Sequence, residues 1–158
     1  MSSRWGATPA QWTHLDLMEG LTADLLPVVS NPNATISPNS RMKSLGKTPS
    51  LYNGSGLVAG FKDWTSHEGT SEEIARWSQQ PDYGICLQTR HVRAVDIDIL
   101  DASIAADIER RLVDALGALP LRRRENSTKR LAFFYVQGEY SKRVMHIGDG
   151  IVEFLATG

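Results

Sequence analysis

The sequence predicts an α+β fold with a largely antiparallel mixed sheet and flanking helices. In its second half, segments with strand-like alternation follow one another through short turns, and one amphipathic helix, over residues 103–116, clearly separates them. A doubly wound parallel sheet would need a helix between successive strands. The 158 residues suit a single domain, which we divide into a helix and loop region, 1–60, and a core, 61–158.

The first part of the chain combines helix patterns with a long loop. Residues 10–26 carry a helical stripe of Leu and Met that ordinarily packs in a core, and residues 25–29 can form a short strand. Residues 30–60 are rich in Asn, Ser, Gly and Pro, as in a long loop. Thr70, followed three residues later by Glu73, predicts a capped helix that stops before Pro81.

The second part reads as a series of strands. Residues 85–87 are expected to form a hairpin with a strand over 92–99. An inner strand is expected over 129–136, since both its faces are apolar. Short strands over 142–146 and 151–155 follow, with a turn at Asp149–Gly150 between them.

Composition sets the broad class of protein. Apolar residues make up 41% and charged residues 22%, as in soluble globular proteins, and no run reaches the roughly 20 apolar residues of a membrane span. Cys86 is the single cysteine, so no internal disulfide can form, and we expect an intracellular, cytoplasmic location. The net charge of −1 argues against bulk coating of nucleic acid.

Two aspartates interrupt the apolar strand over 92–99. Val95 and Ile97 share one face of the strand, so Asp96 and Asp98 share the other, about 7 Å apart. Two like charges at this spacing repel each other, and aspartate is depleted in strands. A divalent cation such as Mg²⁺ or Mn²⁺ would relieve the repulsion. The alternative is a wet strand face with two solvated acids.

Glu153 is a third acid in a strand context. It interrupts the apolar run 151–155, where a buried carboxylate without a partner is costly. A metal shared with Asp96 and Asp98 would satisfy it. The alternative is a strand-edge glutamate paired with an arginine.

Basic residues gather between these acids, over 121–130. Ser127, Lys129 and Arg130 lead into a strand and could contact a triphosphate; the alternative is a solvated basic loop. In the earlier loop, Lys47 is a candidate phosphate or backbone contact, although a lone loop lysine is more often only solvated.

These motifs, in this order, resemble the primase-polymerase family of the archaeo-eukaryotic primase superfamily, in particular the N-terminal domains of phage and plasmid replication proteins. The resemblance covers residues 20–158. It rests on Lys47–Pro49, Gly60–Thr65, Tyr83–Ile85, the Asp96-x-Asp98 strand and Val152–Glu153. The Ser-x-His motif of the family has Ser127-Thr128-Lys129 in its place, without the histidine. Family members usually continue for further strands, so the resemblance implies a C-terminally truncated domain.

The resemblance implies an RRM-like catalytic core and template-directed nucleotidyl transfer by a DNA primase/polymerase. Two Mg²⁺ or Mn²⁺ ions would be held by Asp96, Asp98 and Glu153. The expected partners are nucleoside triphosphates, a single-stranded or primed DNA template and a helicase domain or protein. The residues expected to bind the triphosphate are Ser127, Lys129, Arg130 and Arg124, and those expected to bind DNA are Lys47, Arg122 and Arg123.

Two other functions stay open at this point. A metal-dependent nuclease could use the same acids, but it would also need a base that activates water, and no residue of the sequence stands out for that role. A non-catalytic module that binds nucleotide or DNA needs only the basic segment.

Overall fold

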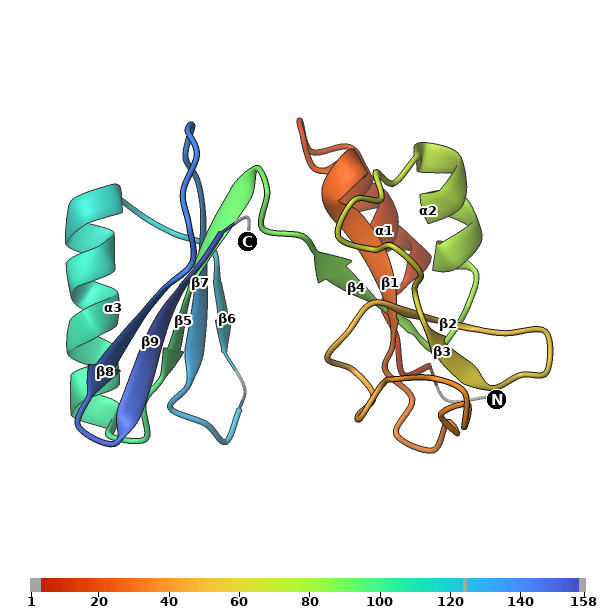
Figure 1. The fold of residues 1–158 in the computed structure, drawn as a ribbon. Helices are drawn as coiled ribbons and strands as arrows, with labels where there is room; N and C mark the ends of the chain where they lie inside the picture. Colours follow the sequence, from red (N-terminus) through yellow and green to blue (C-terminus); the bar gives the residue numbers. More distant parts are fainter. Residues whose placement is uncertain (1–3, 124, 157–158) are drawn as a thin grey trace. The chain divides into compact units, whose positions relative to one another are not determined.

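The computed structural model describes residues 4–123 and 125–156. The chain divides into two compact units, 1–88 and 89–158, and each is described by itself (Figure 1). The first unit ends at Gln88. The sequence suggested one domain, with a helix and loop region over 1–60 and a core over 61–158. The described residues form three α-helices and antiparallel sheets, which confirms the α+β class.

The first unit contains two small antiparallel sheets. Strand β1 (Leu25–Val29) pairs with β4 (Tyr83–Leu87), and β2 (Ser50–Tyr52) pairs with β3 (Val58–Gly60). Helices α1 (Pro9–Asp16) and α2 (Ser71–Ser78) pack against each other, and a 3₁₀ turn, η1 (Thr22–Asp24), leads into β1.

Aromatic and aliphatic side chains together build the core of this unit. Trp12 of α1 is fully buried, with its ring centroid 6.2 Å from that of Trp77 on α2. The long connection between β1 and β2 is fixed to this core by the partly buried Met42 and Leu45, and residue 36 bridges to Val58. The loop region expected over 30–60 therefore holds the β2–β3 hairpin within it.

The sequence predicted α2 well and α1 less well. The capping box at Thr70 and Glu73 is present, as expected. The helix predicted over 10–26 ends at Asp16, and beyond it Leu17 is 80% exposed and Met18 46% exposed. These two apolar side chains therefore do not join the core.

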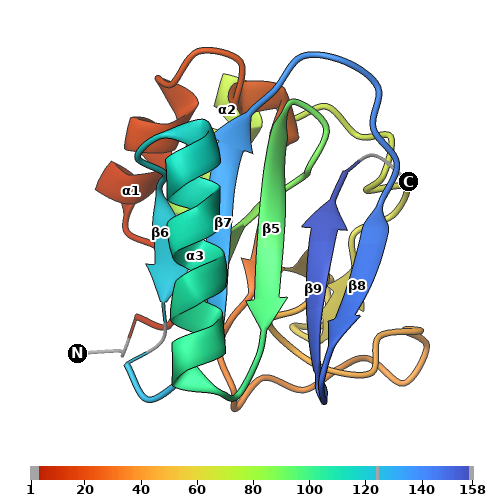
Figure 2. The same ribbon diagram turned by 90° about the vertical axis from the view of Figure 1, so that its left-hand side faces the viewer.

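The second unit is a five-stranded antiparallel sheet covered on one face by a helix (Figure 2). The strand order is β6-β7-β5-β9-β8, so β5 lies at the centre. The helix, α3 (Ala102–Leu116), is capped by the Asp101 carboxylate, which accepts bonds from two backbone N–H groups. The strands are β5 (Val92–Asp98), β6 (Leu121–Arg123), β7 (Arg130–Tyr135), β8 (Arg143–Ile147) and β9 (Gly150–Leu155).

The expected hairpin between 85–87 and 92–99 is wrong. Strand β4 pairs with β1 of the first unit, whereas β5 pairs with β7 and β9. Strands β8 and β9 do form a hairpin at the turn of Gly148 and Asp149. Gly148 has a positive φ of 57°, which glycine adopts without a steric penalty at the first position of such a turn.

Between the sheet and α3 lies the second core. Val95, Ile97 and Ile99 are at most 7% exposed and pack with Ala105 of the helix. Burying such side chains stabilises the unit by about 1.5–3 kcal/mol each.

The helices of residues 4–123 and 125–156 include none with the length and apolar character that a membrane span requires.

Candidate functional site

The three predicted acids lie on one face of the five-stranded sheet, opposite α3; we call this the carboxylate face. Asp96 of β5 stands directly opposite Glu153 of β9 in the antiparallel register. Directly opposite residues share a face, with Cβ atoms about 5 Å apart. Asp98 is two residues further along β5 and so lies on the same face. Strand alternation had predicted this arrangement for the aspartates.

The pKa of the Asp96 carboxyl is raised by burial and by the neighbouring acids. Partial burial raises the pKa of the Asp96 carboxyl above its ordinary value, and the negative charges of Asp98 and Glu153 raise it further. Arg122 and Lys129 lower the pKa in the opposite direction. The carboxylate face thus concentrates negative charge at its centre, with cations around it.

Two lysines are paired with the outer acids. Lys129 Nζ lies 2.7 Å from Asp98 Oδ1, and Lys142 Nζ lies 2.7 Å from Glu153 Oε1. In the described part of the chain, no group of three or more His, Cys, Asp or Glu side chains is positioned to hold a metal ion. With these side-chain positions, the acids share a face but do not form a preassembled metal site.

The position of Lys129 follows from the turn before β7. The Thr128 hydroxyl donates to the Ile99 carbonyl oxygen at 2.6 Å, which fastens the turn to the end of β5. The Lys129 N–H donates to Ser127 Oγ at 3.2 Å. The turn therefore places Lys129 beside Asp98, with Ser127 bonded to the Lys129 backbone.

Arg130 and Arg123 lie on the other face of the sheet. Arg130 is paired in register with Ile97, whose side chain faces α3, and its Nη1 lies 2.6 Å from Glu109 Oε2. Arg123 pairs with the same Glu109 carboxylate. The expected grouping of Arg130 with Lys129 is corrected here, because neighbouring strand residues point to opposite faces. The structure does not bring Arg123 or Arg130 to the acids.

The other predicted site residues are placed as follows. Arg122 lies on the carboxylate face, opposite Leu131, which in turn stands opposite Asp96. Lys47 belongs to the first unit. Arg124 falls outside the described residues.

Sequence reasoning missed two residues that shape this site. Lys142 was placed at the start of the expected strand over 142–146 without a role, although alternation from Val144, which stands opposite Glu153, indicates its face. Glu109 was not singled out, because its partners come from strands that follow α3 in the sequence.

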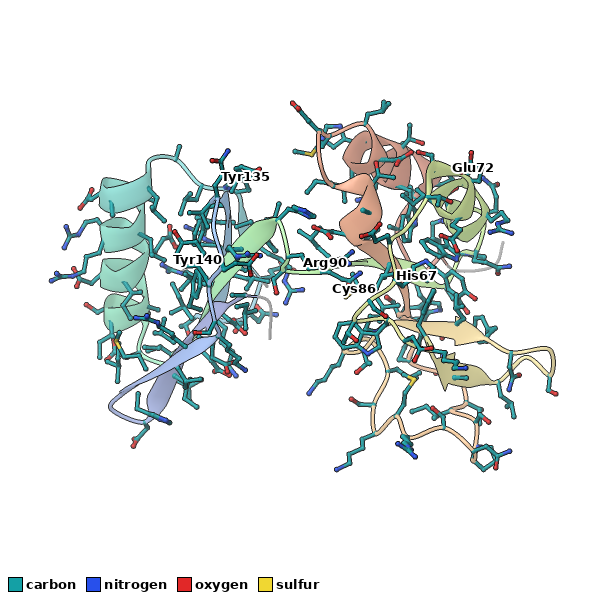
Figure 3. The ribbon with its side chains drawn as sticks, turned by 45° about the horizontal axis from the view of Figure 1, so that its top comes forward. His67, Glu72, Cys86, Arg90, Tyr135 and Tyr140 are labelled. Atoms are coloured by element: carbon teal, nitrogen blue, oxygen red, sulfur yellow. The ribbon has the colours of Figure 1, made fainter. Side chains whose placement is uncertain are left out.

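The side chains of the second unit are drawn in Figure 3. The figure labels Tyr135, which is 66% exposed at the end of β7, and Tyr140 in the β7–β8 connection.

Comparison of the chain with protein-family models, with curated proteins and with solved structures finds no match.

Proposed function

We propose that the chain carries out metal-dependent, template-directed nucleotidyl transfer, with Mg²⁺ or Mn²⁺ held by Asp96, Asp98 and Glu153. One observation carries the proposal: Asp96 and Glu153 are directly opposed across two central strands, with Asp98 beside them. Like charges placed opposite each other destabilise a sheet. Carboxylate oxygens are also the ligands that these hard cations prefer.

The two lysine pairs are weak enough for such an ion to displace them. Both pairs are at least partly exposed, with side-chain exposed fractions between 30% and 51%. Ion pairs of this kind contribute about 0–1 kcal/mol, so a divalent ion that brings its own charge can displace them. The three carboxylates suit the ion because they are oxygen ligands and lie on the same face of the sheet.

In this proposal the residues of the chain bind and orient the substrate. Lys129, released from Asp98, would bind a phosphate of the incoming nucleoside triphosphate, and Ser127 would hold the turn that positions it. Arg122 would supply a second cation from β6. When bound, the ions would acidify the attacking hydroxyl and neutralise charge on the phosphates.

Incorporation of a labelled nucleotide on a primed DNA template tests the function. The chain should incorporate label only with Mg²⁺ or Mn²⁺, and Asp96→Asn should abolish incorporation while the fold is kept. Asp107→Asn is the matched control, because Asp107 lies on α3 and pairs with Arg110 and Arg111. Incorporation by Asp96→Asn at the wild-type rate would refute the proposal.

A second function is favoured by the same lysine pairs. If Asp98 and Glu153 are already neutralised by Lys129 and Lys142, the sheet needs no metal. The unit would then be a non-catalytic module that binds nucleotide or DNA. Nucleotide binding that is equal in EDTA and in Mn²⁺, without incorporation, would identify this module.

A further inference from the structure

The first unit carries a cationic surface that the proposed site does not use. Residues 25–62 hold four basic residues and no acid. All four side chains are exposed. We call this set the cationic loop surface: Arg41, Lys43, Lys47 and Lys62.

Hydrogen bonds and packing gather the segments that carry these four residues around the β2–β3 ladder. The Gly60 N–H donates to Ser40 Oγ at 3.4 Å, one residue before Arg41. Met42 packs over Gly60, where a Cβ on the glycine would lie 3.5 Å from Met42 Cγ. Because Met42 faces inward, its neighbours Arg41 and Lys43 are left on the solvent side.

The other two cations lie at the same end of the ladder. The Phe61 N–H, one residue before Lys62, donates to the Pro49 carbonyl oxygen at 2.9 Å. Lys47 is two residues before Pro49, and the adjacent Gly46 N–H donates to the Val29 carbonyl oxygen at 3.0 Å. The segments that carry the cations are therefore fastened to the folded unit and to each other.

None of the four cations forms an ion pair with any described residue. Even Asp63, next to Lys62 in the chain, does not pair with it. In the second unit, by contrast, Arg110, Arg111, Arg123 and Arg130 are all bound by carboxylates. A cluster of unneutralised cations on an ordered surface attracts a polyanion.

We infer that the cationic loop surface binds the phosphate backbone of single-stranded DNA. The choice of DNA as the polyanion rests on the proposed function, whereas the surface itself is independent of the carboxylates. Four exposed cations on neighbouring segments of one folded unit suit a ligand with regularly repeated charges. The expected binding is independent of base sequence and strongly dependent on salt.

The test is anisotropy of a fluorescent oligothymidylate with the full chain in EDTA, where no metal site can form. Each contact with single-stranded phosphate contributes about 0.7 to the salt slope, so four contacts give roughly 2.8. Affinity should therefore fall about 50-fold between roughly 50 and 200 mM salt. Neutralising all four cations to Gln should bring the slope close to zero.

A matched control separates this surface from overall charge. Neutralising Arg76, Arg110, Arg111 and Arg143 to Gln removes the same charge from other exposed positions and should keep the wild-type slope. The double variant Lys43→Gln/Lys47→Gln should lower the slope by about 1.4, which keeps the test available if the fourfold variant unfolds. Equal losses in control and test variants would overturn the inference, as would binding to phosphatidylserine vesicles without binding to the oligonucleotide.

The outcome is independent of the catalytic proposal. Asp96→Asn should bind the oligonucleotide as the wild type does. If binding follows the four cations but no label is incorporated, only the proposed function fails. If the fourfold variant binds as tightly as the wild type, only the present inference fails.

Discussion

Asp96→Asn should stabilise the metal-free protein, because it removes a carboxylate that faces Glu153 across the sheet and has Asp98 beside it. Such like-charge pairs cost on the order of 0.2–1 kcal/mol. Arg122 and Lys129 offset part of this cost, so we expect a gain of about 0.5 kcal/mol. For a unit of 60–100 residues melting alone, this raises the melting temperature by roughly 2–4 °C.

The pH dependence of protein stability gives a second test of Asp96→Asn. The pKa of Asp96 is raised in the folded state, mainly by burial and then by Asp98 and Glu153. The folded protein therefore binds this proton more tightly than the unfolded chain. The resulting stability is present below the ordinary value of 3.8 and is lost as the pH rises through the raised folded pKa. Asp96→Asn should remove that loss.

Metal should reverse the ranking of the two proteins. A ligand at 100 times its dissociation constant stabilises the folded state by about 2.7 kcal/mol, or roughly 10–20 °C for such a unit. Differential scanning fluorimetry with and without Mn²⁺ measures this shift, which should be large for the wild type and small for Asp96→Asn.

Asp107→Asn is the control with the opposite sign. Hydrogen bonds from Arg111 and Arg110 lower the pKa of Asp107, so its stabilising contribution is present at neutral pH and is lost on acidification. This variant should melt lower than the wild type and respond fully to Mn²⁺. A lower melting temperature for metal-free Asp96→Asn, or an equal Mn²⁺ response in all three proteins, would refute the reasoning.

Three further changes test other parts of the structure. Lys142→Gln should free Glu153 and increase the Mn²⁺-induced shift in melting temperature; an unchanged or smaller shift would count against a metal at this carboxylate. Ile97→Ala should cost about 2–5 kcal/mol in urea unfolding, since the side chain is fully buried in the second core. Burial and its bond to Asp82 raise the pKa of Tyr52 to about 12, so the folded protein should lose stability as the pH rises from 10 towards 12. An ultraviolet titration of the wild type should show one tyrosine ionising near pH 12, and that step should be absent in Tyr52→Phe.

Alternation along a strand was the most reliable sequence signal. It predicted that Asp96 and Asp98 share a face opposite Val95 and Ile97, which the register bears out. The same rule, applied to Lys129 and Arg130, would have separated them, but their charge suggested a common ligand.

Pairing between distant segments could not be predicted in the same way. The segment 85–87 was paired with its neighbour in sequence, although β4 belongs with β1. The first helix was predicted over 10–26, although α1 ends at Asp16. Helix and strand patterns are local, whereas the choice of partner depends on packing between distant residues. The Glu109 pairs and the Lys142–Glu153 pair were missed for this reason.

The central place of β5 has a consequence for how the second unit assembles during synthesis. Both hydrogen-bonding partners of β5, β7 and β9, follow it in the chain. During synthesis on the ribosome, one edge of β5 therefore stays unpaired until β9 has been made. An unpaired apolar strand edge is prone to associate with other chains. The paired aspartates would repel an identical strand aligned so that its aspartates stand opposite them, which disfavours self-association at this edge before β9 is made.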